Sequence, residues 1–339
     1  MSQAHIAHAL RTGAVGSLRS AAVTRVRGTG AWEAVERLSA RPLFVRDGGS
    51  LSTLWLNADA TIRADLQVLV DGSDLILLTE GATSMEVADA LTETDVDVEA
   101  GVVFGCDGPY AWELLTHLVG EGVLGVPWHG TFTLGDGALG RRAGSTGEWG
   151  YDLIVPTDRA EEWSERLNQA AALFDGPTAD VSDLRLAALE AGFFDVHATG
   201  VSTLTPAELQ LRWRVDTAVR GPWSEALSQA LDAPRGRITR LVGPPSASAP
   251  PPGSSIVCDG QRVGMLLHSS VSFLLERPIG LGLLDLPYAV AGLELAVADL
   301  PGWTTQAAPL LHNRSLFVDP QRHSWASRDS DSFPPIVPP

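Results

Sequence analysis

The sequence predicts an α+β protein in which two related mixed units are followed by a small all-β unit. Two observations support this fold class. The run that begins at Gly28 (GTGAWEAVERL) is echoed eighty residues later by the run that begins at Gly108 (GPYAWELLTHL). From about Arg237 the pattern changes to short alternating or apolar runs separated by turns. With 339 residues, 45% of them hydrophobic, the chain can bury two or three cores.

Each copy of the echo joins a strand-like run to an amphipathic helix. The runs AAVTRVR and GVVFGCD precede the two glycines, and a glycine lets the chain turn from strand into helix. Both copies then continue with β-rich sequence and close with a helix, at SMEVADALTE and at DRAEEWSERLNQAAALF. The pattern predicts two βαββα units with antiparallel sheets. We expect residues 21–35 and 99–115 to form equivalent strand–helix pairs, with Trp32 and Trp112 in matching positions.

The rest of the chain predicts a barrel and a loose tail. A helix is expected at DLRLAALEAG, followed by a mixed stretch to about Asp232. The runs after Arg237 predict a small β-barrel, interrupted by a flexible or polyproline-like insertion at 243–255. The polar, proline-rich residues from Asp319 predict a flexible tail that packs little. The predicted domain limits are 1–20 with 99–234, 21–98, 235–318, and 319–339 for the tail.

Charge and cysteine content exclude several classes of function. The net charge is −17, which disfavours nucleic acid and anionic membranes as partners. All 24 basic residues are arginine, so no lysine can form a Schiff base. The two cysteines, Cys106 and Cys258, lie far apart, which favours a cytoplasmic protein without a disulfide scaffold. The N-terminus lacks a signal-peptide core, and charged residues and a proline interrupt the most apolar stretch, 279–300, so no membrane span is expected.

Asp65 is the first candidate for chemistry. A strand ends at Asn57, and after a short turn a second strand begins near Ile62, which places Asp65 early in that strand between apolar neighbours. From the residues alone, Asp65 is either a surface residue or an inward acid in a pocket. An inward carboxylate is desolvated, and its pKa moves toward the range useful for proton transfer. Period-two alternation puts Asp65 on the strand face opposite Leu66 and Val68.

The second candidate is the glycine-rich run from Arg142 to Asp152 (RAGSTGEWGYD). Glycines allow the backbone to approach a flat ligand closely. The carboxylate of Asp152 can accept two parallel N–H bonds from an amidine-like ring edge, such as that of a pterin. A plain β-turn with a solvated acid is the alternative.

The histidines are weaker candidates. His5 and His8 lack a third ligand, so no metal site is predicted. His129 lies near a proposed turn and is interpreted as structural. His268 follows an apolar strand of the barrel unit, where it either packs or faces a pocket.

These motifs together resemble the glycine-cleavage T-protein (aminomethyltransferase) superfamily of folate-binding proteins. The echo at Gly28, the run from Asn57 to Asp65, the glycine-rich run, LRLAALEAG and the barrel run GQRVGMLLHSS occur in that family's order over about residues 8–310. The resemblance implies two ferredoxin-like units and a C-terminal β-barrel, arranged as a three-domain ring around a central folate channel. It also implies tetrahydrofolate as cofactor and Asp65 as the essential acid. The residues expected to bind the cofactor are Asn57, Arg142, Ser145, Glu148, Tyr151, Asp152, Arg185 and His268.

The departures from the family pattern indicate a specialised member. Ser145 stands where the family has a tyrosine, and Arg185 replaces the family arginine only with a shift in register. A chain of net charge −17 without lysine is a poor electrostatic match for an acidic lipoyl carrier, so a small-molecule substrate is expected. The prediction is a one-carbon (methyl, methylene or aminomethyl) transferase. The alternatives are a non-catalytic folate-binding or assembly protein, and an enzyme that reuses the pocket without folate.

Overall fold

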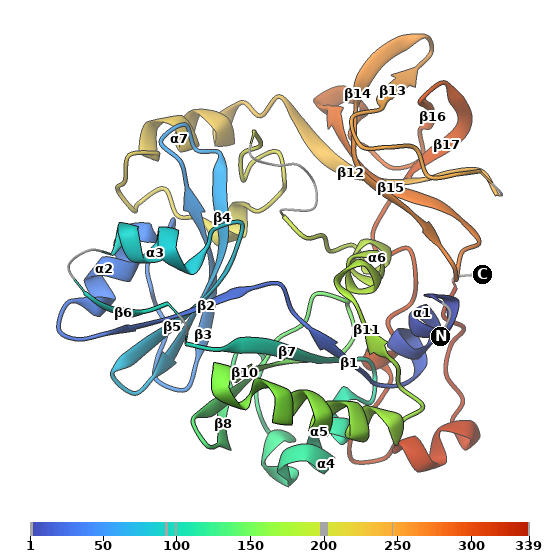
Figure 1. The fold of residues 1–339 in the computed structure, drawn as a ribbon. Coiled ribbons are helices and arrows are strands. Elements are labelled where there is room, and N and C mark those ends of the chain that lie inside the picture. Colours follow the sequence, from blue (N-terminus) through green and yellow to red (C-terminus); the bar gives the residue numbers. More distant parts are fainter. Residues whose placement is uncertain (1–2, 92–93, 99, 197–202, 246, 338–339) are drawn as a thin grey trace.

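The computed structural model describes residues 3–91, 94–98, 100–196, 203–245 and 247–337. Their strands form two open sheets, here called sheets A and B, and one closed barrel (Figure 1). The predicted α+β class and the C-terminal barrel are confirmed. The predicted domain limits concern folding units and stay a prediction.

Sheet A has six strands in the order β11-β1-β7-β10-β9-β8. They are β1 (Val15–Leu18), β7 (Val102–Asp107), β8 (Thr131–Gly135), β9 (Ala138–Arg142), β10 (Gly150–Val155) and β11 (Thr178–Ala179). The helices α4 (Ala111–Val119) and α5 (Ala160–Ala172) pack on one face of this sheet. Leu114 of α4 and Trp163 of α5 share a core there with Tyr151 and Leu153 of β10.

Sheet B has five strands in the order β3-β4-β5-β2-β6. They are β2 (Ala22–Arg27), β3 (Ser50–Leu56), β4 (Ile62–Asp71), β5 (Asp74–Glu80) and β6 (Asp95–Asp97). The helices α2 (Ala31–Leu38) and α3 (Ser84–Ala90) cover one face, where alternate side chains of β4, Leu66 and Val68, meet Val35 of α2 and Val87 of α3. The alternation therefore turns Asp65 and Gln67 toward the opposite face of sheet B.

The repeated sequence pattern corresponds to a repeated arrangement of strands and helix. The order β3-β4-β5-β2 in sheet B has the same connectivity as β8-β9-β10-β7 in sheet A. In each unit a strand leads through a left-handed glycine, Gly28 (φ 95°) or Gly108 (φ 124°), into a helix that carries tryptophan at its second position. Trp32 and Trp112 thus occupy equivalent places, as predicted.

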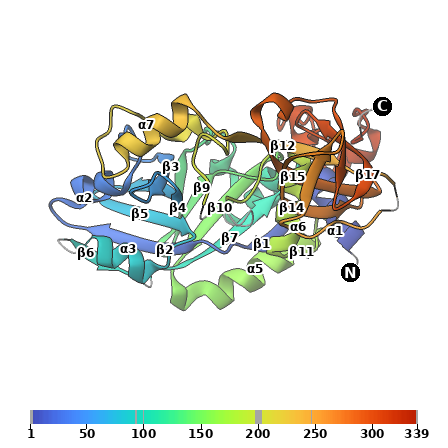
Figure 2. The same ribbon diagram turned by 90° about the horizontal axis from the view of Figure 1, so that it is seen from above.

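The faces of the two sheets that carry no helices pack against each other. A small apolar cluster joins them, with Leu69, Ile76 and Leu78 from sheet B against Val103 and Ile154 from sheet A. This contact fixes the position of β4 and β5 relative to β10. Polar side chains farther along these strands are thereby brought to one shared space. Figure 2 shows the strands of sheet B beside those of sheet A.

The barrel closes in the order β12-β15-β14-β13-β16-β17. Its strands are β12 (Gly236–Val242), β13 (Ser255–Cys258), β14 (Gln261–Ser272), β15 (Arg277–Asp285), β16 (Glu294–Val297) and β17 (Leu300–Gln306). Leu241, Ile256, Leu266 and Trp303 fill its interior. The proline-rich segment connects β12 to β13, and the carbonyl of Pro250 accepts a hydrogen bond from the Ser269 hydroxyl.

Helix α6 (Val181–Ala191) joins the barrel to the rest of the molecule. It begins with a capping box formed by Asp180 and Asp183, and it ends at Gly192, which is left-handed. Its buried Glu190 accepts hydrogen bonds from Ser272 of β14 at 2.7 Å and from Arg11 of α1 (Gln3–Thr12) at 3.2 Å. No helix in the described part of the chain is long and apolar enough to cross a membrane.

The segment that leads into the barrel, residues 203–232, packs against both sheet B and helix α6. The Ile62 amide of β4 donates to the Leu204 carbonyl, and Leu209, Trp223 and Leu227 of α7 (Ser224–Asp232) share a core with Leu54. This placement depends on long-range tertiary contacts, which local sequence patterns do not specify.

The tail also departs from the prediction that it packs little. Trp325 lies edge-on to Tyr110, with 5.6 Å between ring centroids, and its amide donates to the Glu113 side chain at 2.7 Å. Phe333 packs on the same core. Two aromatic side chains within a polar, proline-rich composition are sufficient to attach the segment to sheet A's unit.

Candidate functional site

A cavity of about 510 Å³ lies where sheets A and B, α6 and the barrel meet. Its walls come from β4 and β5 of sheet B, β9 and β10 of sheet A, and β12 of the barrel. Further lining residues come from α6, the residues that follow it, segment 209–214, and residues 19–21, 128–129 and 143–145. This volume is in the range of small-molecule and cofactor sites.

Asp65 faces this cavity from β4, and its carboxylate is held on both oxygens. Arg214 donates to the two oxygens at 2.7 and 2.5 Å, and Gln67 donates at 2.8 Å. The Asp65 side chain is 18% exposed, and that of Arg214 is 6% exposed. Arg214 is itself anchored to the Thr53 carbonyl on the neighbouring strand β3. The pair therefore fixes an oriented carboxylate at the cavity wall.

Asp152 faces the cavity from β10, and two guanidinium groups hold it. Arg19 reaches it at 3.2 Å and Arg141 at 2.7 Å. Burial acts to raise the pKa of Asp152, but Arg141 and then Arg19 outweigh burial, and the pKa is lowered. Arg19 also pairs at 2.7 Å with Asp107, whose pKa is raised, with burial the largest cause.

Glu80 is different from the other acids of the cavity. It is the last residue of β5, directly opposite Asp65 in the β4–β5 ladder, and it is half-buried. Its side chain forms no hydrogen bond or ion pair with any residue that the structure describes. Burial, followed by the charges of Asp195 and Asp65, raises the pKa of Glu80 to about 7.

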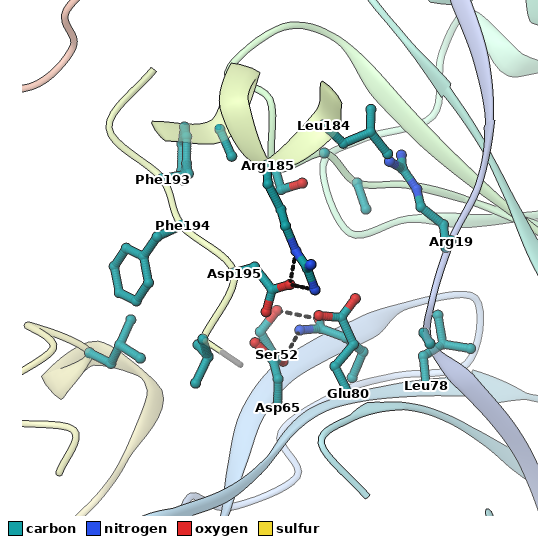
Figure 3. Close-up of a pocket in the computed structure, with 18 of the residues that line it drawn as sticks. Arg19, Ser52, Asp65, Leu78, Glu80, Leu184, Arg185, Phe193, Phe194 and Asp195 are labelled. Atoms are coloured by element: carbon teal, nitrogen blue, oxygen red, sulfur yellow. Dashed lines mark hydrogen bonds and ion pairs between the residues drawn. The ribbon is translucent and has the colours of Figure 1, made fainter. Parts of the chain in front are cut away.

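The side of the cavity opposite the sheets carries an ion pair and aromatic rings. Arg185 on α6 pairs with Asp195 at 2.7 Å, and Phe193 and Phe194 lie beside them. Figure 3 shows this pair above Asp65 and Glu80. The cavity thus presents carboxylates paired with guanidinium groups on the sheet side, and one ion pair with aromatic rings on and just after α6.

His129 is a cavity residue that sequence reasoning interpreted as structural. It adopts a left-handed backbone conformation (φ 63°), and its Nδ1 lies 3.3 Å from the Ser50 hydroxyl. Burial, and then the charges of Arg141 and Arg214, lower the pKa of His129 to about 4. The ring is therefore neutral at physiological pH and contributes no cation to the cavity.

The structure brings four of the predicted site residues to the cavity: Asp65, Ser145, Asp152 and Arg185. Ser145 is exposed, within the turn that precedes β10. The other five predicted residues do not line it: Asn57, Arg142, Glu148, Tyr151 and His268.

Physical reasons account for these five positions. Asn57 closes its own turn by donating to the Thr61 hydroxyl at 3.0 Å. Arg142 stacks over the Trp149 ring at 4.3 Å and lies on the strand face opposite Arg141.

Alternation also places Tyr151 in the core beneath Phe132, where burial raises the pKa of its hydroxyl to about 12. Glu148 is buried between Arg11 and the Ser315 hydroxyl, which donates at 2.6 Å. His268 lies half-buried on β14; burial and then the nearby charge of Arg185 lower its pKa.

Several charged cavity residues were missed by the sequence analysis: Arg19, Glu80, Arg141, Asp195 and Arg214. Alternation offered a signal for Arg141, because it pairs directly with Asp152 across the β9–β10 ladder. Glu80 ends an apolar strand that sits next to the strand of Asp65, which is also a local signal. Arg214 and Asp195 come from distant segments and have none.

Comparisons with known proteins agree with this architecture. The family described as GCVT N-terminal domain matches residues 7–219. A protein named aminomethyltransferase from Parasynechococcus marenigrum is 28% identical over 302 residues, covering 81% of this chain and 80% of that protein. An aminomethyltransferase from Streptomyces avermitilis is 28% identical over 274 residues, covering 75% and 73%.

Among solved structures, the chain is similar to the glycine cleavage system aminomethyltransferase T from Bartonella henselae. The TM-score is 0.80 at 18% identity, over 91% of this chain and 88% of that one. At this identity the likeness shows the fold.

Proposed function

The chain belongs to the GCVT N-terminal domain family, and we propose that it catalyses tetrahydrofolate-dependent transfer of a one-carbon unit to or from a small molecule. The observation that carries the proposal is the position of Asp65. Its carboxylate, held by Arg214, faces a cavity formed by both sheets and the barrel. The names of the relatives, aminomethyltransferases, support the same reaction class.

The residues of the cavity fit tetrahydrofolate. The pterin ring of this cofactor donates hydrogen bonds, its middle ring is flat, and its glutamate is anionic. The cavity offers carboxyl acceptors in Glu80 and Asp152, and an aromatic face in Phe194. On the barrel wall, the buried Nε of Arg240 has no partner among the described residues, so it remains available to an anionic group.

The chain's own groups then have separate roles. Tetrahydrofolate, when bound, supplies the nitrogen atoms that carry the one-carbon unit. Asp65 presents a carboxylate that Arg214 orients, and a preorganised charge of this kind stabilises positive charge that develops nearby. Asp152 contributes to binding and keeps Arg19 and Arg141 in place.

We also propose that the second substrate is a small molecule and not a lipoyl carrier protein. A chain with a net charge of −17 and no lysine repels an acidic carrier domain. Salt-sensitive binding to such a carrier, or ammonia release from an aminomethylated carrier, would contradict this part of the proposal.

The test of the reaction is turnover. The purified full chain is incubated with tetrahydrofolate and a panel of methylated or aminomethylated small donors, and one-carbon-substituted folate is measured by mass spectrometry. Asp65→Asn should lower the rate about 10²-fold or more, because it removes a charge that acts on the transition state. Full activity in Asp65→Asn would remove the role assigned to Asp65.

The bidentate ion pair favours one rival function. A carboxylate that Arg214 already neutralises suits a folate-binding protein that has lost catalysis. Tetrahydrofolate binding without turnover on any donor, in both wild type and Asp65→Asn, would support this rival.

A further inference from the structure

Glu80 is the one cavity acid without a guanidinium partner in the described part of the chain. The three other acids that line the cavity are all paired: Asp65 with Arg214, Asp152 with Arg19 and Arg141, and Asp195 with Arg185. Each of these three carboxylates already accepts a hydrogen bond from a guanidinium group. The half-buried carboxyl group of Glu80 has no such guanidinium partner among the described residues.

Some groups around Glu80 favour its neutral form, and one favours its charged form. Asp65 faces it across the strand ladder, and Asp195 faces it from the segment after α6. Both carboxylates oppose ionisation of Glu80, as do Asp152 and burial itself, while Arg19 favours ionisation. The pKa of about 7 that results lies near the working pH of an enzyme, where a general acid or base is most effective.

We propose that Glu80 is the proton-exchanging carboxyl of this cavity, while Asp65 acts as a fixed anion. The inference rests on the proposed function for its chemistry. The Glu80 carboxylate takes one proton from an N–H or O–H group of a bound reactant, whose bonding electrons stay on that atom. The resulting neutral carboxylic acid returns the proton later in the cycle. Neither an oxidant nor a further reactant is needed.

The first test does not depend on folate. The full chain is labelled with ¹³C at glutamate side-chain carboxyl carbons, and its resonances are followed by NMR between pH 4 and pH 9. We expect one resonance to titrate with a midpoint near 7 and to be missing in Glu80→Gln. Glu33→Gln, at an exposed position on α2, is the matched control and should keep that resonance. Absence of a near-neutral midpoint, or its survival in Glu80→Gln, would overturn the proposal.

The second test measures whether binding of tetrahydrofolate changes the protonation of Glu80. Calorimetric titration with tetrahydrofolate at pH 7, in two buffers of different ionisation enthalpy, measures the protons exchanged on binding. Wild type and Glu33→Gln should exchange a fraction of a proton that Glu80→Gln does not exchange. Equal proton exchange in all three proteins would count against Glu80. If wild type fails to bind tetrahydrofolate but still shows the near-neutral resonance, the proposed function fails and the assignment of Glu80 stands.

Discussion

Arg214 holds both carboxylate oxygens of Asp65, at 2.7 and 2.5 Å, across a separation of 149 residues in the chain. The contact ties the segment that leads into the barrel to the sheet strand that carries the candidate acid. It contributes to stability as well as to the site, so its removal has a measurable effect on folding.

Arg214→Met should lower the free energy of unfolding by about 3 kcal/mol, because it leaves Asp65 largely buried without its cation. Urea denaturation measures this change. Arg212→Met, at the exposed position two residues earlier, is the control and should change stability little. Adding Asp65→Asn to Arg214→Met should recover part of the loss; a purely additive double variant would show that the two residues are not coupled.

The raised pKa of Glu80 predicts a specific pH dependence of stability. The folded state binds this proton more tightly than the unfolded state, so stability falls as the pH rises from about 4.5 to about 7. Glu80→Gln removes this loss and should be more stable than wild type by about 1–3 kcal/mol at pH 8, but equal to it near pH 4. Thermal and urea unfolding across this range measure the difference. A constant difference between the two proteins would contradict the shifted pKa.

His129 predicts the opposite dependence. Its folded-state pKa of about 4 lies below the usual 6.5, so the unfolded state takes up a proton first as the pH falls. Stability should therefore be lost between pH 6.5 and pH 4. His129→Asn keeps a residue that tolerates the left-handed backbone and cannot protonate, and it should reduce this acid loss by about 1–3 kcal/mol. If both proteins lose the same stability between pH 6.5 and pH 4, His129 is not buried as a neutral ring.

Arg11 forms the most deeply buried charge cluster outside the cavity. Its side chain is fully buried and contacts Glu148 at 3.3 Å and Glu190 at 3.2 Å. Arg11→Met should destabilise the protein by about 3–5 kcal/mol, because two buried carboxylates lose their cation. Chemical denaturation measures the loss, and Arg37→Met on the exposed face of α2 is the comparison. A loss below 1 kcal/mol would mean that water or other donors replace Arg11.

Local periodicity was sufficient to predict most of the architecture. The repeated glycine and tryptophan at Gly28–Trp32 and Gly108–Trp112 reported a duplicated strand–helix pair, because both positions are set by the turn and the first helical residues. Period-two alternation placed Asp65 opposite Leu66, since the pleat alone determines that relation. The same rule applied one strand farther would have selected Arg141 over Arg142.

The rest of the site depends on contacts that no local pattern encodes. Arg214, Asp195 and Arg19 enter the cavity from three separate segments, and only the packing of sheet A, sheet B and α6 brings them together. The tail was expected to pack little because its composition is polar, yet Trp325 alone supplies a ring contact and a hydrogen bond. Composition is an average over the whole segment. It therefore does not show that a single aromatic side chain is buried against another part of the molecule.

Isothermal titration of the 339-residue chain with tetrahydrofolate tests most directly whether this cavity binds the cofactor. We expect saturable binding at one site per chain, retained within about tenfold in Asp65→Asn and weakened about tenfold or more in Asp152→Ala. Absence of saturable binding in the wild type, or unchanged affinity in Asp152→Ala, would contradict this expectation.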